Sequence, residues 1–533
     1  MNKLIFVFGI VLISFSTLAQ SFPFKIQKSD VFKDEYKESE IVLYQDGGNG
    51  GILIVRSYVA GISAKKGFYI EHYDKDLKLT KEFEYEITHT ITEKFNLVLG
   101  VCSFNNEIQI VEIYYDLKQK SYICQANVIS EDFNISKKEL FRLTKEDVKK
   151  VGYFNLESTF NERIGKIWTN DISGDISKID NAFDFSFNFY NRQPITKGNK
   201  PDIVMTVNEA KNAFAISIDY NAKNSEYLKL YLFDKELNKK IETEFSREIN
   251  DKKYNFQNIQ VDPNGNYIYL LGKAYTELQD KKKEGGKYLF ELTKINSDSQ
   301  KSQLININEN FIGSLKSVFH NNQLICIGFY SEINDFQYKG ISYFKLDTNS
   351  LEILQSKYNP FSEQFMVDKY GEEKDKELKY LTLKNYFFTK NDELLLNAQE
   401  EYLTISSSGS GMNGFGGGTR TYASYDDIVS AKLSVDGDLV WARNINKKQG
   451  FQNSENENYV SYTAAIVGDM PYYFINAGER VKELDDKRIE FKDSNKNKAN
   501  INLIRIKEDG DFEYEKILEN EENEVPFVVS KEV

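Results

Sequence analysis

The sequence predicts an all-β fold, and within that class a β-propeller of about seven to eight four-stranded blades. Three observations support this prediction. Aromatic residues make up 14% of the 533 residues and hydrophobic residues 41%, a composition that favours strands around a sizeable core. A short turn pattern recurs along the chain between strand-like runs. About four such runs surround each copy, and units that repeat at roughly 40–50 residues or slightly more are typical of propeller blades.

The recurring turn joins the third and fourth strand-like runs of each unit. Its copies read YDKDLKL, SEDFNIS, FDKELNK, INSDSQK, LDTNSLE, SVDGDLV and KEDGDFE, beginning at Tyr73, Ser130, Phe233, Ile295, Leu346, Ser434 and Lys507. The pairs Asp436-Gly437 and Asp509-Gly510 predict type I′ turns, which need positive φ at both central positions. The other copies carry weaker turn signals of the same kind.

The repeated units cover most of the chain. They start near residues 41, 95, 202, 254, 311, 379 and 460, and the spacing leaves room for one degenerate unit near residue 150. A right-handed β-helix would need a much shorter period. Tandem β-sandwiches would need linkers, for which Asn199-Lys200-Pro201 is the best break. Because a twisted sheet has two apolar faces that it cannot cover alone, we expect one propeller domain over residues 20–533.

The N-terminus, MNKLIFVFGIVLISFSTLAQ, has the pattern of a signal peptide over residues 1–19. Lys3 supplies the positive charge, residues 4–13 form a short apolar run, and Ala19 precedes the expected cleavage site. No later apolar run approaches the ~18 residues needed to span a bilayer, so no transmembrane segment is predicted. We expect an exported protein, either periplasmic or extracellular and associated with the outer surface.

The charge balance argues against nucleic acid as a partner. The chain has 68 basic and 81 acidic residues, a net charge of −13, and a negative field repels phosphate backbones. The three cysteines, Cys102, Cys124 and Cys326, lie in apolar strand-like runs. Cys102 and Cys124 flank one intervening strand, about two strand spacings apart and beyond disulfide reach. We expect three buried thiols.

Few motifs for catalysis or cofactor binding are present. The histidines are His72, His89 and His320, with no HExxH pair and no Cys/His cluster, so neither a metal site nor a catalytic triad is predicted. The Gly409-x-Gly411-x-x-Gly414 pattern matches a dinucleotide fingerprint in letters only. More glycines follow it where a helix would be needed, so the prediction is a flexible connector. No cofactor is expected.

Carboxylates are abundant, and two groups of them raise specific hypotheses. A pair among Glu400, Glu401, Asp426 and Asp427 could perform glycoside chemistry across a channel, although Asp426-Asp427 also fits a strand that opens with exposed charge. The acidic turns at Asp436 and Asp438, and at Asp509 and Asp511, could bind calcium. They lack EF-hand spacing, however, and plain hairpin turns are the favoured interpretation. Whether the protein is an enzyme is left open, and the sequence favours a protein without catalytic activity.

Three long insertions, residues 278–287, 406–420 and 481–500, join the second and third strands of their units. In an up-and-down meander these loops emerge on one rim of the ring, which marks a binding face or neutral loop growth. Aromatic side chains flank the glycine-rich insertion and are suited to interfaces. The candidate binding residues are therefore Tyr402, Tyr422, Tyr425, Asp426 and Asp427.

The leading functional hypothesis is a binding scaffold for a protein, a peptide or a surface polysaccharide. The alternatives are a carbohydrate-active hydrolase or lyase that uses channel-facing carboxylates, and a structural protein of the cell envelope. The oligomeric state is unknown. The C-terminal stretch VPFVVSKEV either completes a blade with the N-terminal strand or docks separately.

From about residue 183 to residue 519 the chain resembles a family of secreted, propeller-like proteins of Bacteroidota bacteria. The likeness is carried by FDKEL at 233–237, VDPNGNYIYLLGKAY at 261–275, NQLICIGFYSE at 322–332, KGISYFKLD at 339–347, YDDIVSAKLSVDGDLVWARNINKKQ at 425–449 and YVSYTAA at 459–465. The resemblance implies a propeller fold and export. It implies no reaction, ligand or catalytic residue.

Overall fold

The computed structural model describes residues 26–33, 39–60, 65–144, 191–194, 203–220, 226–247, 254–275, 288–305, 310–331, 338–373, 378–407, 419–452, 459–478, 481–484, 488–492, 500–519 and 528–529. The predicted signal peptide and the predicted degenerate unit near residue 150 lie outside these ranges. Within them, no helix has the length and apolar character needed to cross a membrane.

Six of the sheets are four-stranded and antiparallel. Sheet 1 contains β1 (Glu40–Gly48), β2 (Gly51–Ala60), β3 (Lys65–Tyr73) and β4 (Leu79–Glu86). Sheet 2 contains β5 (Glu93–Phe104), β6 (Glu107–Asp116), β7 (Ser121–Ile129) and β8 (Ile135–Thr144). Sheet 3 contains β10 (Ile203–Val207), β11 (Ala213–Tyr220), β12 (Glu226–Asp234) and β13 (Lys239–Arg247). Sheet 4 contains β14 (Tyr254–Val261), β15 (Ile268–Tyr275), β16 (Tyr288–Ile295) and β17 (Gln300–Ile305). Sheet 5 contains β18 (Phe311–His320), β19 (Gln323–Ser331), β20 (Gly340–Leu346) and β21 (Ile353–Pro360). Sheet 7 contains β27 (Thr463–Val467), β28 (Met470–Ala477), β31 (Asn500–Ile506) and β32 (Phe512–Leu518).

Sheet 6 is larger than the others and has eight strands. Its meander is β22 (Leu381–Phe388), β23 (Leu394–Ser407), β24 (Thr419–Leu433) and β25 (Leu439–Ile445), and the added strands are β9 (Asn191–Pro194), β26 (Lys447–Phe451), β29 (Lys482–Glu483) and β30 (Ile489–Lys492). The predicted count of seven to eight four-stranded blades is therefore wrong, because the described residues form six such blades.

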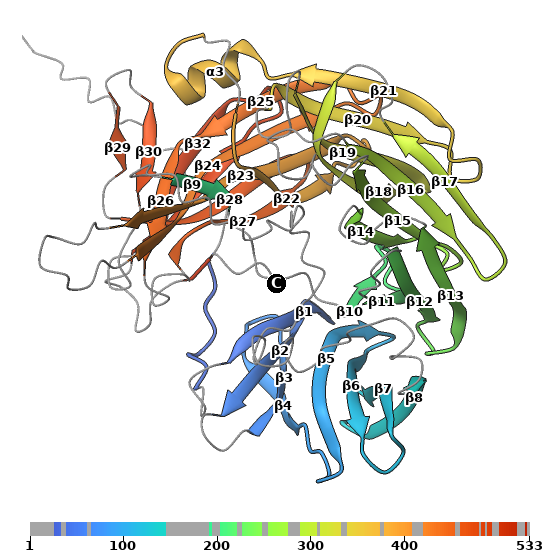
Figure 1. The fold of residues 1–533 in the computed structure, drawn as a ribbon. Coiled ribbons are helices and arrows are strands. Elements are labelled where there is room, and N and C mark those ends of the chain that lie inside the picture. Colours follow the sequence, from blue (N-terminus) through green and yellow to red (C-terminus); the bar gives the residue numbers. More distant parts are fainter. Residues whose placement is uncertain are drawn as a thin grey trace, which may run out of the picture.

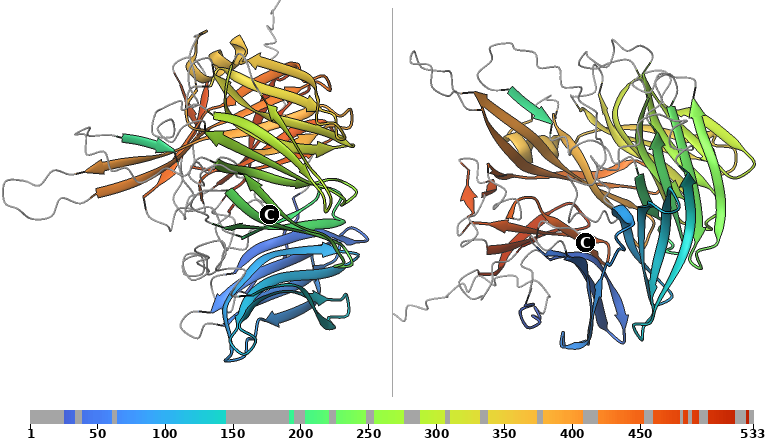
Figure 2. Two further views of the ribbon diagram at one scale, coloured as in Figure 1. Left: turned by 45° about the vertical axis from the view of Figure 1, so that its right-hand side comes forward. Right: turned by 60° about the horizontal axis from the view of Figure 1, so that its bottom comes forward.

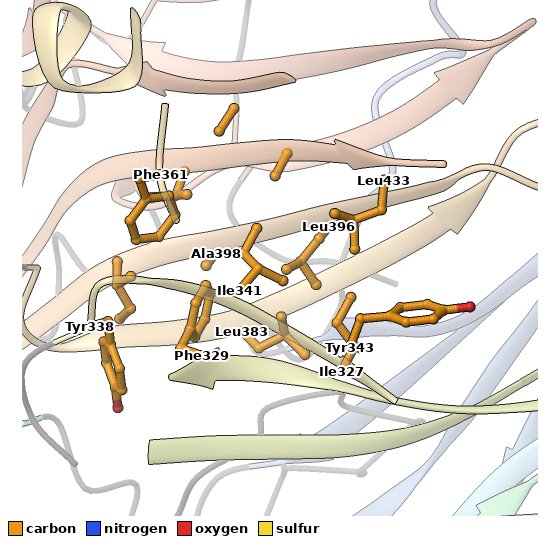
Figure 3. Close-up of a cluster of buried hydrophobic side chains, with 14 of the residues drawn as sticks. Ile327, Phe329, Tyr338, Ile341, Tyr343, Phe361, Leu383, Leu396, Ala398 and Leu433 are labelled. Atoms are coloured by element: carbon orange, nitrogen blue, oxygen red, sulfur yellow. The ribbon is translucent and has the colours of Figure 1, made fainter. Parts of the chain in front are cut away.

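The sheets stand side by side around a common centre, as expected for a β-propeller (Figure 1). Buried apolar side chains fill the space between successive sheets in six clusters, which join sheets 1 and 2, 2 and 3, 3 and 4, 4 and 5, 5 and 6, and 6 and 7. Between sheets 5 and 6, Figure 3 shows Ile327, Phe329 and Tyr343 facing Leu383, Leu396 and Ala398. Sheets 2 to 6 thus bury both faces against their neighbours, which explains why their strands rarely alternate cleanly between apolar and polar residues.

The recurring turn has one backbone geometry in sheets 1, 2, 3, 6 and 7. In sheet 6 the Gly437 N–H donates to the Ser434 carbonyl at 2.8 Å, and Gly437 has a φ of 75°. The equivalent positive-φ residues are Leu77, Phe133, Leu237 and Gly510. The predicted type I′ turn is wrong, because Asp436 and Asp509 do not have positive φ. A three-residue loop with one left-handed residue after the turn joins these strands instead.

Sheets 1 and 7 share no strand in the part of the chain that the structure describes. The segment 26–33 packs on sheet 1, where the Phe32 ring lies 5.5 Å from the Tyr69 ring and 4.4 Å from the Arg56 guanidinium. At the other end of the chain, the Val529 N–H donates to Asn476 of sheet 7 at 2.9 Å. Val528 and Val529 are the two residues of the C-terminal stretch that the structure describes; they form no strand and lie against sheet 7.

The three cysteines are buried and free, as predicted. Cys102 lies on β5 and Cys124 on β7, with β6 between them. Burial raises the pKa of all three thiols well above the ordinary value. They therefore pack as small apolar side chains and are not reactive nucleophiles.

Candidate functional site

One hairpin of sheet 6 extends beyond the ring (Figure 2). Its strands β23 and β24 have 14 and 15 residues, whereas the next longest described strand has 12. Short strands flank the outer part of the hairpin: β9 pairs with β23, β26 pairs with β24, β30 runs parallel to β26, and β29 pairs with β30. We call this outer part, residues 401–407 and 419–425 with β9, β26, β29 and β30, the projecting sheet.

The strands of the projecting sheet come from separate insertions in the chain. β9 lies between sheets 2 and 3 in sequence, β26 between β25 and β27, and β29 and β30 between β28 and β31. Two of the three insertions expected to mark a binding face therefore contribute to it, since the 406–420 insertion includes the end of β23 and the start of β24, and the 481–500 insertion contains β29 and β30. The third, 278–287, lies outside the described residues.

A helix that the sequence did not predict anchors the base of this sheet. α3 (Glu363–Tyr370) follows β21, with the Ser362 hydroxyl accepting from the Phe365 N–H at its N-cap and Gly371 at its C-cap with a φ of 81°. Ser362 and Gly371 are a normal pair of helix-start and helix-stop residues. Phe365 is fully buried in the cluster between sheets 5 and 6. Its burial orients the helix, and with it Asp368 and Lys369 near the C-terminal end.

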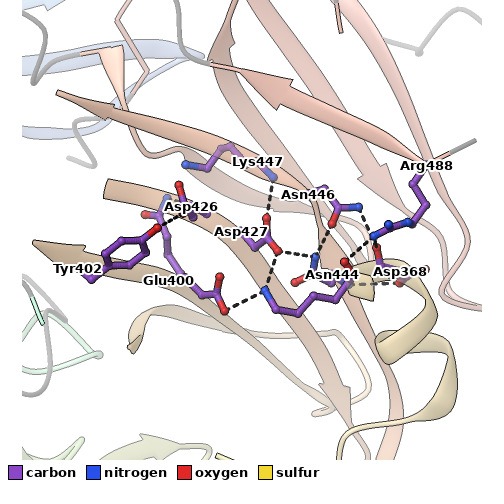
Figure 4. Close-up of polar contacts among 11 residues, drawn as sticks. Asp368, Glu400, Tyr402, Asp426, Asp427, Asn444, Asn446, Lys447 and Arg488 are labelled. Carbon is purple, nitrogen blue, oxygen red and sulfur yellow. Dashed lines mark hydrogen bonds and ion pairs between the residues drawn. The ribbon is translucent and has the colours of Figure 1, made fainter. Parts of the chain in front are cut away.

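Lys369 of α3 forms ion pairs with carboxylates on both strands of the hairpin, Glu400 and Asp427, which Figure 4 labels. Its Nζ lies 2.8 Å from Glu400 Oε1 on β23 and 2.7 Å from Asp427 Oδ2 on β24. The two carboxylates meet because β23 and β24 pair, with a bulge between Gln399 and Glu401 that re-aims the side chains. The Lys369 side chain is 9% exposed and both carboxylates are 16% exposed, so water screens this group of charges only weakly.

Asp368, the neighbour of Lys369, holds the helix to β25. Its carboxylate accepts two hydrogen bonds from Arg443, at 2.5 Å from Nε and 3.0 Å from Nη2. Its backbone carbonyl accepts from Asn446 at 2.8 Å and from Arg488 at 3.0 Å. The bidentate geometry fixes the helix in orientation as well as position. α3 thereby connects β25, the residue before β26 and the residue before β30.

Asp427 uses both carboxylate oxygens within the network. Oδ1 accepts from the Lys447 backbone N–H at 2.9 Å, and Oδ2 accepts from Asn444 Nδ2 at 3.0 Å in addition to Lys369. Glu401, also a candidate from the sequence, points to a different cation and pairs with Lys384 at 2.6 Å. Each carboxylate is therefore engaged by a cation or an amide of the protein itself.

The charges in the network shift several pKa values. Burial, with a smaller effect of Asp427, raises the pKa of Glu400 to about 7, and Lys369 opposes that rise. Burial would lower the pKa of Lys369, but Asp427 and Glu400 outweigh it, so its pKa lies above the ordinary value and the ammonium stays charged. Burial lowers the pKa of Lys447 to about 7, where the ammonium donates to the Tyr425 carbonyl and to Gln449 Oε1. Burial also raises the pKa of Asp426.

The predicted aromatic residues lie together but have different environments. Tyr402 is buried, and its hydroxyl donates to Asp426 Oδ2 at 2.6 Å. Tyr425 stacks on Phe451 of β26, with ring centroids 5.9 Å apart. Tyr422, farther out on the hairpin, is 40% exposed. Of the five candidate binding residues, Tyr422 therefore presents the largest described apolar surface to solvent, whereas Tyr402, Asp426 and Asp427 hold the base of the projecting sheet.

This arrangement gives little support to a glycoside hydrolase mechanism. Such a mechanism needs two carboxyl groups on opposite sides of a scissile bond, one of them free to transfer a proton. Here Glu400 and Asp427 converge on the same ammonium. The carboxylates of the acidic turns also have partners within the protein. Asp438 pairs with Lys357 at 2.5 Å, and Asp509 accepts from the Asp511 N–H of its own turn at 3.0 Å. Among the described residues no group of three metal-ligating side chains is present.

No family model matches the chain, and no curated protein matches it significantly. The resemblance to secreted Bacteroidota proteins stays a prediction. Similar solved structures include the propeller domain of the Trilobed protease from Pyrococcus furiosus, at 8% identity and a TM-score of 0.31, covering 75% of this chain and 91% of that one. Another is the Pyrococcus horikoshii acylaminoacyl peptidase, at 8% identity and a TM-score of 0.27, with 80% of this chain and 54% of that one covered.

A third similar structure is Drosophila Plexin A in complex with Semaphorin 1b, at 8% identity and a TM-score of 0.29, covering 76% of this chain and 86% of that one. The chain spans just over half the length of the acylaminoacyl peptidase that it matches. Identities and TM-scores at this level carry no argument about activity. The assignment as a propeller depends on the seven sheets and the apolar clusters between them.

Proposed function

We propose that this protein is an exported β-propeller that acts as a binding scaffold, and that the projecting sheet is the surface that recognises a partner polypeptide. One observation carries the proposal. Strands from three separate places in the sequence extend a single hairpin outside the ring: β9 and β26 pair with its two strands, and β30 and β29 continue the sheet from β26. Neutral growth of individual loops gives no reason for insertions so far apart in sequence to assemble on one surface.

The polar network supports the proposal because it gives that surface a rigid base. Lys369 links both strands of the hairpin to α3, and Asp368 links α3 to β25 through Arg443. A site built on packed and hydrogen-bonded elements loses less conformational entropy on binding than one built on loops. The exposed Tyr422 supplies an aromatic contact of the kind that dominates protein interfaces.

Site-specific photo-cross-linking tests the proposal. A photoreactive amino acid replaces Tyr422, which is 40% exposed, in the full chain expressed in its native cells. The matched control carries the same group at Ile135 of β8 in sheet 2, which is 47% exposed. We expect discrete protein adducts from position 422 and none from position 135. Equal labelling at both positions, or no protein adduct at 422, would refute the proposal. Loss of glycan binding in Tyr422→Ala without any protein adduct would favour a polysaccharide ligand.

A further inference from the structure

β9 is added to the projecting sheet from a distant part of the chain. It pairs antiparallel with β23 in the register Tyr402↔Pro194, Leu403↔Gln193, Thr404↔Arg192 and Ile405↔Asn191. The ring strand β22 pairs with β23 only as far as Glu400. Beyond that residue the edge of β23 would lack a neighbouring strand, and an unpaired strand edge is a ready template for another chain.

The geometry points to this edge of β23 as a strand-acceptor site, occupied in this structure by β9 and able to take an extended peptide from a partner protein in its place. The inference rests on the proposed function and specifies how the partner is recognised. Main-chain hydrogen bonds would supply the affinity, and the side chains on either side of β23 would supply the specificity.

The length of β9 makes it exchangeable. Only four residues of β9 pair with β23. The backbone hydrogen bonds of so short a strand outweigh the entropy lost on ordering it by only a small margin, so β9 fills the site in most molecules and can still leave it. A longer partner strand could pair with more of the edge that β23 presents, because β23 continues to Ser407.

Pro194 also distinguishes replacement of β9 from addition beside it. Proline is found at sheet edges because it cannot donate to a further strand, and it discourages pairing there. A partner strand placed outside β9 would meet this residue, whereas a partner strand in the place of β9 would meet β23, whose paired positions 402–405 contain no proline. Replacement is therefore the favoured mode.

A synthetic peptide of residues 187–198 of this chain, FNFYNRQPITKG, is the probe. The test variant is Arg192→Pro/Gln193→Pro in the full chain, which removes two N–H groups from β9. The matched control is Lys482→Pro/Glu483→Pro, in the two-residue strand β29 at the opposite edge of the same sheet. We expect the test variant to bind the peptide at least about tenfold more tightly than wild type or the control, because apparent affinity falls by the fraction of molecules whose site is already filled.

A second variant keeps the inference falsifiable if the prolines disturb folding. In Gln193→Cys/Leu403→Cys the two cysteines are register partners, so mild oxidation should form a disulfide that holds β9 in place. The oxidised form should lose peptide binding, and reduction should restore the wild-type level. Equal binding by the oxidised and reduced forms would overturn the inference. So would failure of the cysteines to cross-link, or no binding by a proline variant with an unchanged melting temperature.

The two proposals fail separately. Cross-linking of a partner at position 422 without peptide exchange leaves the scaffold standing and refutes the strand-acceptor site. Peptide exchange without any cross-linked partner establishes the acceptor edge and refutes the proposed function.

Discussion

Lys369→Met removes the cation that two buried carboxylates share, and its effect can be worked out from the structure. Each carboxylate oxygen lies 2.7–2.8 Å from Nζ, where the gross Coulomb attraction is about 6 kcal/mol at an effective dielectric constant near 20. Desolvation offsets much of that attraction, and deleting one member of a buried pair typically costs about 3–5 kcal/mol. We expect Lys369→Met to lower the free energy of unfolding by about 3–4 kcal/mol at pH 7. This value lies toward the lower end of the range of about 3–5 kcal/mol because Glu400 can take up a proton, which leaves only Asp427 as an uncompensated buried charge.

The loss should depend on pH in a defined direction. Glu400 has a pKa raised from 4.5 to about 7 in the folded protein. It therefore binds more protons when folded than when unfolded between these values, and the free energy of unfolding falls as the pH rises through that window. Removing Lys369 removes the charge that opposes this effect and raises the pKa of Glu400 further. We expect the destabilisation to be larger at pH 8 than at pH 5.5 by about 1–2 kcal/mol.

Urea denaturation at both pH values, with hydrogen exchange measured on peptides from β23 and β24, provides the assay. The control is the triple variant Lys369→Met/Glu400→Gln/Asp427→Asn, which removes the charges together and should lie within about 1 kcal/mol of wild type. A loss below about 1 kcal/mol for Lys369→Met, or the same loss at both pH values, would refute the assignment of a buried ionic network.

Three further predictions follow from single features. Lys447→Met should raise the melting temperature at pH 6, and the gain should shrink by pH 9. The pKa of Lys447 falls from 10.5 to about 7 on folding, so the folded state binds fewer protons in this window and the wild-type protein gains stability as the pH rises. Gly437→Ala should destabilise more than Gly468→Ala. Both glycines have positive φ, but a Cβ at 437 would lie 2.3 Å from Tyr343 Cδ1, whereas one at 468 meets nothing within 4 Å. We expect about 1 kcal/mol for Gly468→Ala and about 2–4 kcal/mol for Gly437→Ala. Replacing residues 408–418 by Asn-Gly should change the melting temperature by less than about 3 °C, because β23 and β24 are anchored at their base.

Differential scanning calorimetry on these variants provides the measurements. A drop in melting temperature for Lys447→Met at pH 6 would mean that its hydrogen bonds to Tyr425 and Gln449 outweigh the cost of burying the charge. Equal losses for the two glycine variants would remove the argument from contact with Tyr343. Loss of cooperative unfolding after the loop replacement would show that the hairpin depends on its tip.

The repeated units could be predicted because their signals are local. A turn such as Asp74 to Leu77 needs only residues adjacent in sequence. Its hydrogen bond runs from the Leu77 N–H to the Asp74 carbonyl, three residues earlier, at 3.0 Å. Strand-like runs on either side then have only one simple way to pair. The type I′ assignment was wrong because an Asp-Gly pair is compatible with more than one short hairpin loop, and the sequence does not distinguish them.

The composition of sheet 6 could not be predicted by the same means. β9 precedes β23 by about two hundred residues, and no periodicity relates an isolated four-residue strand to a distant edge. α3 is a helix of eight residues in an otherwise all-β pattern. Eight residues are too few for the spacing of apolar side chains to identify a helix.

The candidate site was predicted in part. Glu400, Asp426 and Asp427 were singled out because they are carboxylates close together on adjacent strand-like runs, and the structure brings them together at the base of the projecting sheet. Their cation, Lys369, comes from the helix that was missed, and Arg443 and Arg488 had no distinguishing neighbours in sequence. The only available signal was the pattern SEQFMVDKYG, with its N-cap serine and C-terminal glycine.

The order in which strands follow one another has a consequence for how the molecule assembles. Sheets 1 to 5 each use four strands in succession, so each can finish as soon as its own stretch of chain is available, and early blades need not wait for the C-terminus. Sheet 6 differs, because β9 is made long before β23 and must remain without its partner while three intervening blades are completed. The ring can therefore grow one blade at a time, whereas the surface outside it is among the last parts of the molecule to be finished.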